Sequence, residues 1–135
     1  MVRTPAVLAL WLVPSLVSAN GAFTHVHISQ VAADGLGPGA LETLLASPAN
    51  RAALEAGSMF PDSGYAVGDP YGELAHWEPF LGALIAQLRA TYGGDLSSPE
   101  AQRAVAFALG VASHGMADQS YDTTLLERAF EVDGP

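Results

Sequence analysis

The chain has 135 residues, half of them hydrophobic and 14% charged, and its formal net charge is −9. This length and composition fit one folded domain with its own core and exclude a disordered tail. The basic residues are scattered arginines without a lysine, which disfavours nucleic-acid binding and electrostatic docking on anionic membranes but accommodates a bound cation.

The first nineteen residues have the features of an export signal. Arg3 supplies a positive charge, residues 6–17 form an apolar run, and residues 17–19 (Val-Ser-Ala) resemble a signal-peptidase site. The run is too short to span a bilayer. We therefore predict a cleavable signal peptide over 1–19, a secreted or periplasmic domain over 20–135, and no transmembrane anchor; a retained helical anchor at the N-terminus is the alternative.

Helical periodicity dominates the rest of the chain, and strand-like alternation is absent. We expect a short first helix over about 24–33. A second segment, 39–57, contains Pro48, which predicts two short helices with Ser47 capping the latter. The stretch 59–75 is rich in Gly, Pro, Asp and Tyr and predicts a long loop, and ordered loops of this length are often functional.

Two longer helices follow the predicted loop. The span 76–92 has apolar residues at helical spacing, which predicts an amphipathic helix with an inward face that includes Trp77, Phe80 and Leu81. The dipeptide Ser98-Pro99 is a favoured helix start, and that helix is expected to reach about residue 130. Its apolar run, 104–112, predicts burial on all sides. The fold class is therefore predicted to be all-α, a compact multi-helix domain.

The end of that apolar run carries residues that suit metal binding. His114 and Asp118 are four residues apart, so they share one helical face, and Asp122 continues the same stripe. Such a stripe presents metal ligands or forms a hydrogen-bonded histidine–aspartate pair, and the spacing alone leaves both interpretations open. The chain has no cysteine, so a zinc site would use histidine and carboxylate ligands.

The other histidines extend this set. His25 and His27 are two residues apart, which places them about 200° apart on a helix, so one of them is expected to face inward. We predict that His27 is not a ligand. His76 opens the predicted amphipathic helix, and Asp62 lies in the predicted loop before it. The chain thus has the parts of a histidine and carboxylate site from four separate segments.

These segments resemble a known family. The motifs "THVHI", "AGSMFPDSGY", "AHWEPFL" and "AFALGVASHGMADQSYD" occur in the order and approximate spacing found in zinc-dependent phospholipase C. Within that family, the sequence most resembles the N-terminal catalytic domain of glycosylphosphatidylinositol-specific phospholipase D. The resemblance implies a secreted all-α enzyme with up to three zinc ions between its helices. A fungal single-strand nuclease family shares that cluster.

The resemblance also implies roles for individual residues. His25 matches a ligand near the mature N-terminus, and Asp62 matches an aspartate assigned to metal ligation or general-base catalysis. His76, His114 and Asp118 match three further ligands, with Asp118 in the place of a bridging carboxylate. Zinc in such a cluster lowers the pKa of bound water and holds phosphate oxygens.

The sequence departs from the family pattern at three places. Asp122 occupies the position where the family has a histidine, so its role as a ligand is the least secure. The histidine and glutamate that complete one metal site in the bacterial phospholipases have no counterpart up to Pro135. Asn20 stands where those enzymes use an N-terminal tryptophan. The ligands present here therefore imply one or two zinc ions, in the N-terminal part of such a domain.

The predicted function is hydrolysis of phospholipid or glycosylphosphatidylinositol-type substrates by a secreted zinc-dependent phosphodiesterase. A single-strand nuclease-like phosphodiesterase is one alternative, which the absence of a basic patch disfavours. An inactive, truncated metal-binding module is the other. The choice between C-type and D-type cleavage stays open.

Overall fold

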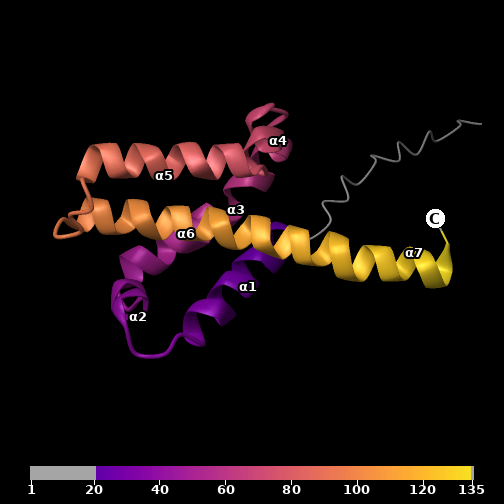
Figure 1. The fold of residues 1–135 in the computed structure, drawn as a ribbon, viewed down its shortest axis with the longest axis horizontal. Coiled ribbons are helices and arrows are strands. Elements are labelled where there is room, and N and C mark those ends of the chain that lie inside the picture. The colour runs from indigo at the N-terminus through magenta and orange to yellow at the C-terminus, as the bar shows by residue number, and fades with distance from the viewer. Residues whose placement is uncertain (1–20, 135) are drawn as a thin grey trace, which may run out of the picture.

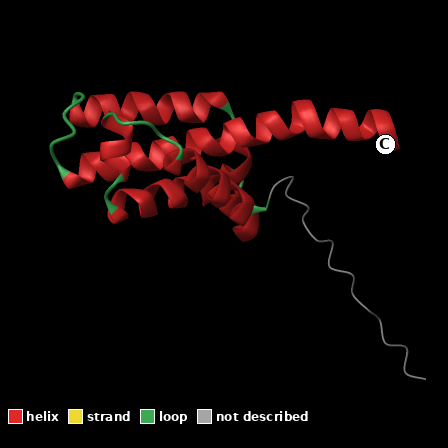
Figure 2. Ribbon diagram, turned by 90° about the horizontal axis from the view of Figure 1, so that it is seen from below, coloured by secondary structure: helices red, strands yellow, loops and turns green. Residues whose placement is uncertain are grey.

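A computed structural model describes residues 21–134, and every regular element in that range is a helix (Figure 2). The prediction of an all-α fold is confirmed. The predicted signal peptide and Asn20 lie outside the described residues. Within 21–134, no helix is long and apolar enough to cross a membrane. The helices are α1 (Ala22–Asp34), α2 (Ala40–Leu45), α3 (Pro48–Val67), α4 (Tyr71–Ala75), α5 (Glu78–Tyr92), α6 (Pro99–Ser120), the π-helical segment η1 (Tyr121–Leu126) and α7 (Glu127–Asp133).

Helix α6 is the central element, as the apolar run predicts. It packs along α3, and also contacts α1, α2 and α5; α5 lies beside it in Figure 1. The buried cluster at this junction contains Leu45, Leu54 and Ala106, with Leu109 packed against it. Side chains from α1, α2, α3 and α6 therefore form one core, to which α6 contributes residues that precede its polar end.

Two glycines allow α3 and α6 to approach to backbone contact. A Cβ on Gly57 would lie 2.0 Å from the carbonyl oxygen of Phe107, and one on Gly110 would lie 2.1 Å from that of Leu54. Both distances are impossible for real side chains, so only glycine fits at this crossing. The close crossing places Ser58 of α3 within hydrogen-bonding distance of α6.

The prediction of a long loop over 59–75 is wrong. Helix α3 continues from the expected short helix to Val67, with Pro61 buried inside it, and α4 follows after only three residues. The glycines serve packing here: a Cβ on Gly64 would lie 2.3 Å from the Cα of Gly72. Pro48 does separate α2 from α3, but Ser47, although it is the N-cap residue, makes no capping side-chain hydrogen bond.

The helix predicted over 76–92 begins at Glu78, and His76 instead terminates α4. Trp77 has an extended backbone before the first turn, so its side chain does not continue the apolar stripe, and it is 60% exposed. Its assignment to the core is therefore wrong. Phe80 and Leu81 are half-buried, and none of the residues of α5 is fully buried, because only one side of this helix meets α6.

The last and first predicted helices are confirmed. The Ser98 hydroxyl accepts a hydrogen bond from the backbone N–H of Ala101 at 3.1 Å, which caps α6. The helix continues without a break through η1 and α7, and α7 projects beyond the other helices (Figure 1). The first helix, expected over 24–33, corresponds to α1, and Gly35 is its C-cap residue.

Candidate metal centre

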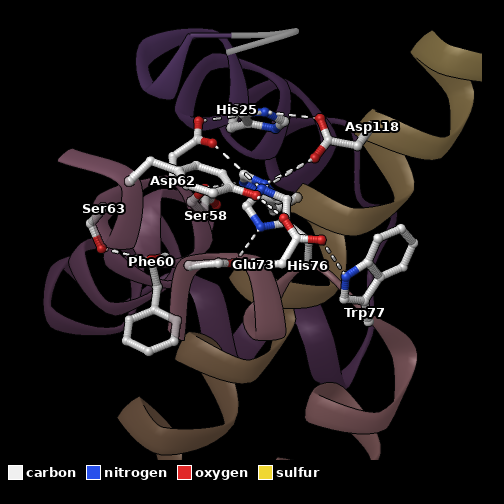
Figure 3. Close-up of polar contacts among 12 residues, drawn as sticks. His25, Ser58, Phe60, Asp62, Ser63, Glu73, His76, Trp77 and Asp118 are labelled. Atoms are coloured by element: carbon white, nitrogen blue, oxygen red, sulfur yellow. Dashed lines mark hydrogen bonds and ion pairs between the residues drawn. The ribbon is translucent and has the colours of Figure 1, made fainter. Parts of the chain in front are cut away.

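Five of the six predicted site residues converge where α1, α3, α4 and α6 meet; His25, Asp62, His76 and Asp118 are labelled in Figure 3. His25 comes from α1, Asp62 from α3, and His76 from the end of α4. His114 and Asp118 come from one face of α6, and their four-residue spacing brings them into contact. The helical crossing thus joins residues that are up to 93 positions apart in sequence.

The two aspartates lie between the three imidazole rings. Asp118 Oδ1 is 3.2 Å from Nε2 of His25, and Oδ2 is 3.1 Å from Nε2 of His114 and 3.8 Å from Nε2 of His76. Asp62 Oδ1 is 3.5 Å from Nε2 of His76, and its Oδ2 is 4.0 Å from Nε2 of His25. Asp118 is therefore the shared neighbour of all three histidines.

Backbone carbonyls set the orientation of two of these rings. Nδ1 of His114 is 2.8 Å from the carbonyl oxygen of Ser58, and Nδ1 of His76 is 2.6 Å from that of Gly72. A carbonyl oxygen only accepts, so Nδ1 donates in both rings. The lone pair of each neutral ring is then on Nε2, which faces the carboxylates, as in histidines that bind a metal through Nε2.

Buried nitrogens at the centre point to a cation. His25 and His114 are almost completely buried, and their rings stack at 3.7 Å. Among the described residues, neither ring nitrogen of His25 nor Nε2 of His114 makes a hydrogen bond of acceptable geometry. Buried polar side-chain atoms usually have a partner, and a metal ion would supply one here.

The donor positions fit zinc. Two groups of three donors, His25, His114 and Asp118 in one and Asp62, His76 and His114 in the other, each have ligand atoms within 4.8 Å of one another. Zinc bonds of 2.0–2.2 Å in a tetrahedron separate ligand atoms by roughly 3.3–3.6 Å. Shortening the distances between these ligand atoms by about 1 Å would therefore bring them to the spacing of a zinc site. Imidazole with carboxylate is also a donor set that zinc accepts.

The electrostatics of the pair on α6 also favour a cation. Burial opposes the charge of Asp118, but contact with His114 and His25 outweighs it and holds the pKa of this carboxyl well below its usual range. Burial likewise opposes protonation of His114, yet the Asp118 carboxylate and the Ser58 carbonyl together raise the pKa of His114 above its ordinary value. The carboxylate is thus ionised at neutral pH.

Zinc binding should consequently compete with protons at His114. The pKa of His114 is raised above the ordinary histidine value of roughly 6.5. The ring is therefore largely protonated near pH 6 and must lose that proton when zinc binds, whereas a smaller fraction of the rings is protonated near pH 8. Calorimetric titration in buffers of different ionisation enthalpy should show weaker binding and more proton release at the lower pH. Equal proton release at both values would contradict this coupling.

A cleft of about 1000 Å³ opens onto the centre, and Asp62, His76 and Asp118 are among its lining residues. Its walls are mainly apolar, with no arginine among the lining residues, and come from α3, α4, α5, α6 and η1. The apolar lining residues include Trp77, Leu81, Val111 and Met116. The centre is therefore accessible to a molecule with a substantial apolar part.

A hydrogen-bonded group at the cleft links α3, α4 and the start of α5. The Tyr65 hydroxyl donates to Glu73 at 2.7 Å, and the Trp77 indole N–H donates to the other oxygen of Glu73 at 3.0 Å. Burial and contact with Glu73 raise the pKa of Tyr65 to about 12. Sequence patterns did not indicate Glu73, because its contact with Tyr65 depends on how α3 and α4 pack.

The remaining candidates lie outside the two donor groups. Asp122 is exposed, lies in the first turn of η1 and lines the cleft, but belongs to neither group. His27 is exposed, in keeping with the expectation that only one of the two N-terminal histidines faces inward. Sequence patterns also missed Ser58 and Gly72, whose contributions come through backbone carbonyls that carry no side-chain signature.

Comparison with known proteins agrees with this geometry. The family profile described as "Zinc dependent phospholipase C" matches residues 24–121, a range that includes all five converging residues. The chain belongs to the zinc-dependent phospholipase C family.

Known proteins from several organisms are similar to the chain. The phosphatidylinositol-glycan-specific phospholipase D of Bos taurus is 31% identical over 121 residues, which are 84% of this chain and 14% of that protein. The Mus musculus protein of the same name is 33% identical over 122 residues, again 84% and 14%. The Dictyostelium discoideum one is 44% identical over 70 residues, 50% and 7%. The chain thus spans about a seventh of the mammalian relatives. No solved structure matches.

Proposed function

We propose that the chain contributes the zinc centre of a secreted phosphodiesterase that hydrolyses phospholipid or glycosylphosphatidylinositol-type substrates. The observation that carries this proposal is the convergence of three histidines and two aspartates beside a largely apolar cleft. The names of the relatives support a phosphatidylinositol-glycan substrate. Export is proposed from the pattern of residues 1–19.

We assign the ligand roles from the contacts. His25, His76 and His114 would bind zinc through nitrogens that face the carboxylates, with Asp118 shared between sites. Bound zinc would supply positive charge for phosphate oxygens and would lower the pKa of water. Asp62 lines the cleft and lies 3.5 Å from His76, so its carboxylate is suited to ligation, to orienting a water molecule or to accepting its proton. Asp122 would be a peripheral ligand at most.

The cleft favours lipid over nucleic acid. Single-stranded nucleic acid binds along positively charged grooves, often with stacked aromatic side chains. Here the residues that line the cleft include Glu73, Glu78 and Asp122 but neither arginine nor lysine. Trp77 and Met116, which are 60% and 64% exposed, add apolar surface at the cleft, and this surface suits acyl chains next to a phosphodiester.

The purified chain should release a phosphorylated head group or phosphatidic acid from phosphatidylcholine vesicles or from a glycosylphosphatidylinositol-anchored protein. A chelator should abolish this activity and added zinc should restore it. The identity of the products distinguishes C-type from D-type cleavage. Faster hydrolysis of single-stranded DNA would overturn the substrate assignment, and zinc binding without hydrolysis of any substrate would favour the inactive metal-binding module.

A further inference from the structure

Three serine hydroxyls form a hydrogen-bonded chain in the interior beside the metal centre. The hydroxyl oxygens of Ser29 and Ser113 are 2.7 Å apart, and those of Ser29 and Ser58 are 2.6 Å apart. Ser58 also donates to the carbonyl oxygen of Leu54 at 2.9 Å. Ser29 and Ser58 are almost completely buried, and Ser113 is half-buried. We refer to Ser29, Ser58 and Ser113 as the serine chain.

Each member of the serine chain belongs to a helix that supplies a candidate ligand. Ser29 lies one turn after His25 on α1, Ser58 lies one turn before Asp62 on α3, and Ser113 directly precedes His114 on α6. Ser58 is connected twice, because its carbonyl oxygen also accepts from Nδ1 of His114. The serine chain therefore links α1, α3 and α6 by hydrogen bonds within one helical turn of candidate ligands.

Packing alone does not account for three hydroxyls at this junction. Alanine would pack at these positions without needing hydrogen bonds, as Ala33 and Ala106 do where helices meet in the neighbouring core. A buried hydroxyl without a partner is destabilising, so all three oxygens must remain in register for the chain to be satisfied. Hydrogen bonds are directional, and they fix the rotation and height of each helix more narrowly than methyl contacts do.

We propose that Ser29, Ser58 and Ser113 are positioning residues for the zinc centre, with Ser29 as the central member. This proposal rests on the zinc site of the proposed function. The hydroxyls hold α1 against α3 and α6, so that His25 meets Asp118 while His114 stays on the Ser58 carbonyl. His76 is held separately by Gly72 and does not depend on Ser29.

The test compares Ser29→Ala with Ser63→Ala in the full chain. Ser63 is a matched control because it lies on α3 beside Asp62 and its hydroxyl also contacts two groups, Phe60 O and Tyr71 Oη, outside the serine chain. Zinc affinity is measured by competition with a chromophoric chelator, and site geometry by the visible absorption of the cobalt-substituted protein. Substitution of outer-sphere partners lowers metal affinity by about 10- to 100-fold. We therefore expect a loss of zinc affinity of that size and an altered cobalt spectrum for Ser29→Ala, and neither change for Ser63→Ala.

Ser113→Ala provides a second measurement if Ser29→Ala does not fold, since Ser113 is half-buried and makes one bond of the chain. It should weaken zinc binding in the same direction. Unchanged affinity and spectrum in the serine variants would overturn the proposal, as would an equal change in Ser63→Ala. If the parent binds zinc but hydrolyses no substrate, the proposed function fails while the zinc readouts still decide the role of Ser29. A parent that binds no zinc overturns both.

Discussion

Replacing Asp118 by asparagine should almost abolish zinc binding and phosphodiester hydrolysis while leaving the helices folded. Asp118 contacts Nε2 of all three histidines at the centre, at 3.1 to 3.8 Å, and asparagine keeps the shape but removes the charge. Loss of a direct, shared ligand should exceed the 10- to 100-fold effect of outer-sphere changes, so we expect a fall in zinc affinity of about 1000-fold or more. Chelator competition measures it.

Asp122→Asn is the matched control, since it makes the same change one turn later on the same continuous helix. Asp122 is exposed and belongs to neither donor group, so its substitution should change zinc affinity by less than about tenfold. Circular dichroism should show parental helix content for both variants. A comparable loss in both variants would show that Asp122 is a ligand of equal weight, and no loss in Asp118→Asn would refute the assignment of Asp118.

Gly110→Ala should cause a large loss of stability. Its Cβ would lie 2.1 Å from the Leu54 carbonyl oxygen and 2.7 Å from the backbone nitrogen of Ser58, and the two helices would have to separate. Overpacking of this kind costs about 3 kcal/mol or more, which corresponds to a fall in Tm of at least roughly 10 °C for a domain of this size. The same separation would lengthen the contact between His114 and the Ser58 carbonyl, so zinc affinity should fall as well.

Gly82→Ala separates this effect from helix propensity. Gly82 is inside α5, and a Cβ there meets nothing within 4 Å. Alanine should therefore raise the free energy of unfolding by about 0.5–1 kcal/mol. The two glycine-to-alanine changes are thus expected to have opposite signs in thermal unfolding. A neutral Gly110→Ala would show that α3 and α6 do not cross at backbone contact.

Sequence patterns predicted the parts of this protein that depend on local chemistry. The helical class, the first and last helices, the Ser98 cap and the central position of α6 follow from periodicity and capping, and the structure confirms them. The candidate set was assembled from the few histidines and the resemblance to the family. The helix crossing then brings His25, Asp62, His76, His114 and Asp118 together, while their roles as ligands remain a proposal.

The failures arose where tertiary contacts override local propensity. Gly64 and Pro61 are helix breakers in isolation, but Gly64 packs on Gly72 and Pro61 is buried, so α3 runs through the predicted loop. Trp77 fits a helical stripe by spacing, yet it lies before the first turn and is exposed. The serine chain and the carbonyl of Ser58 have no local signature, because their partners lie on other helices.

Equilibrium dialysis of the purified, chelator-stripped chain against zinc at neutral pH, followed by elemental analysis, tests the metal centre most directly. The proposed centre predicts that the parent retains zinc in at least stoichiometric amount and that Asp118→Asn retains far less at the same free zinc concentration. A folded parent that binds no zinc, or one whose zinc content is the same after Asp118→Asn, would contradict it.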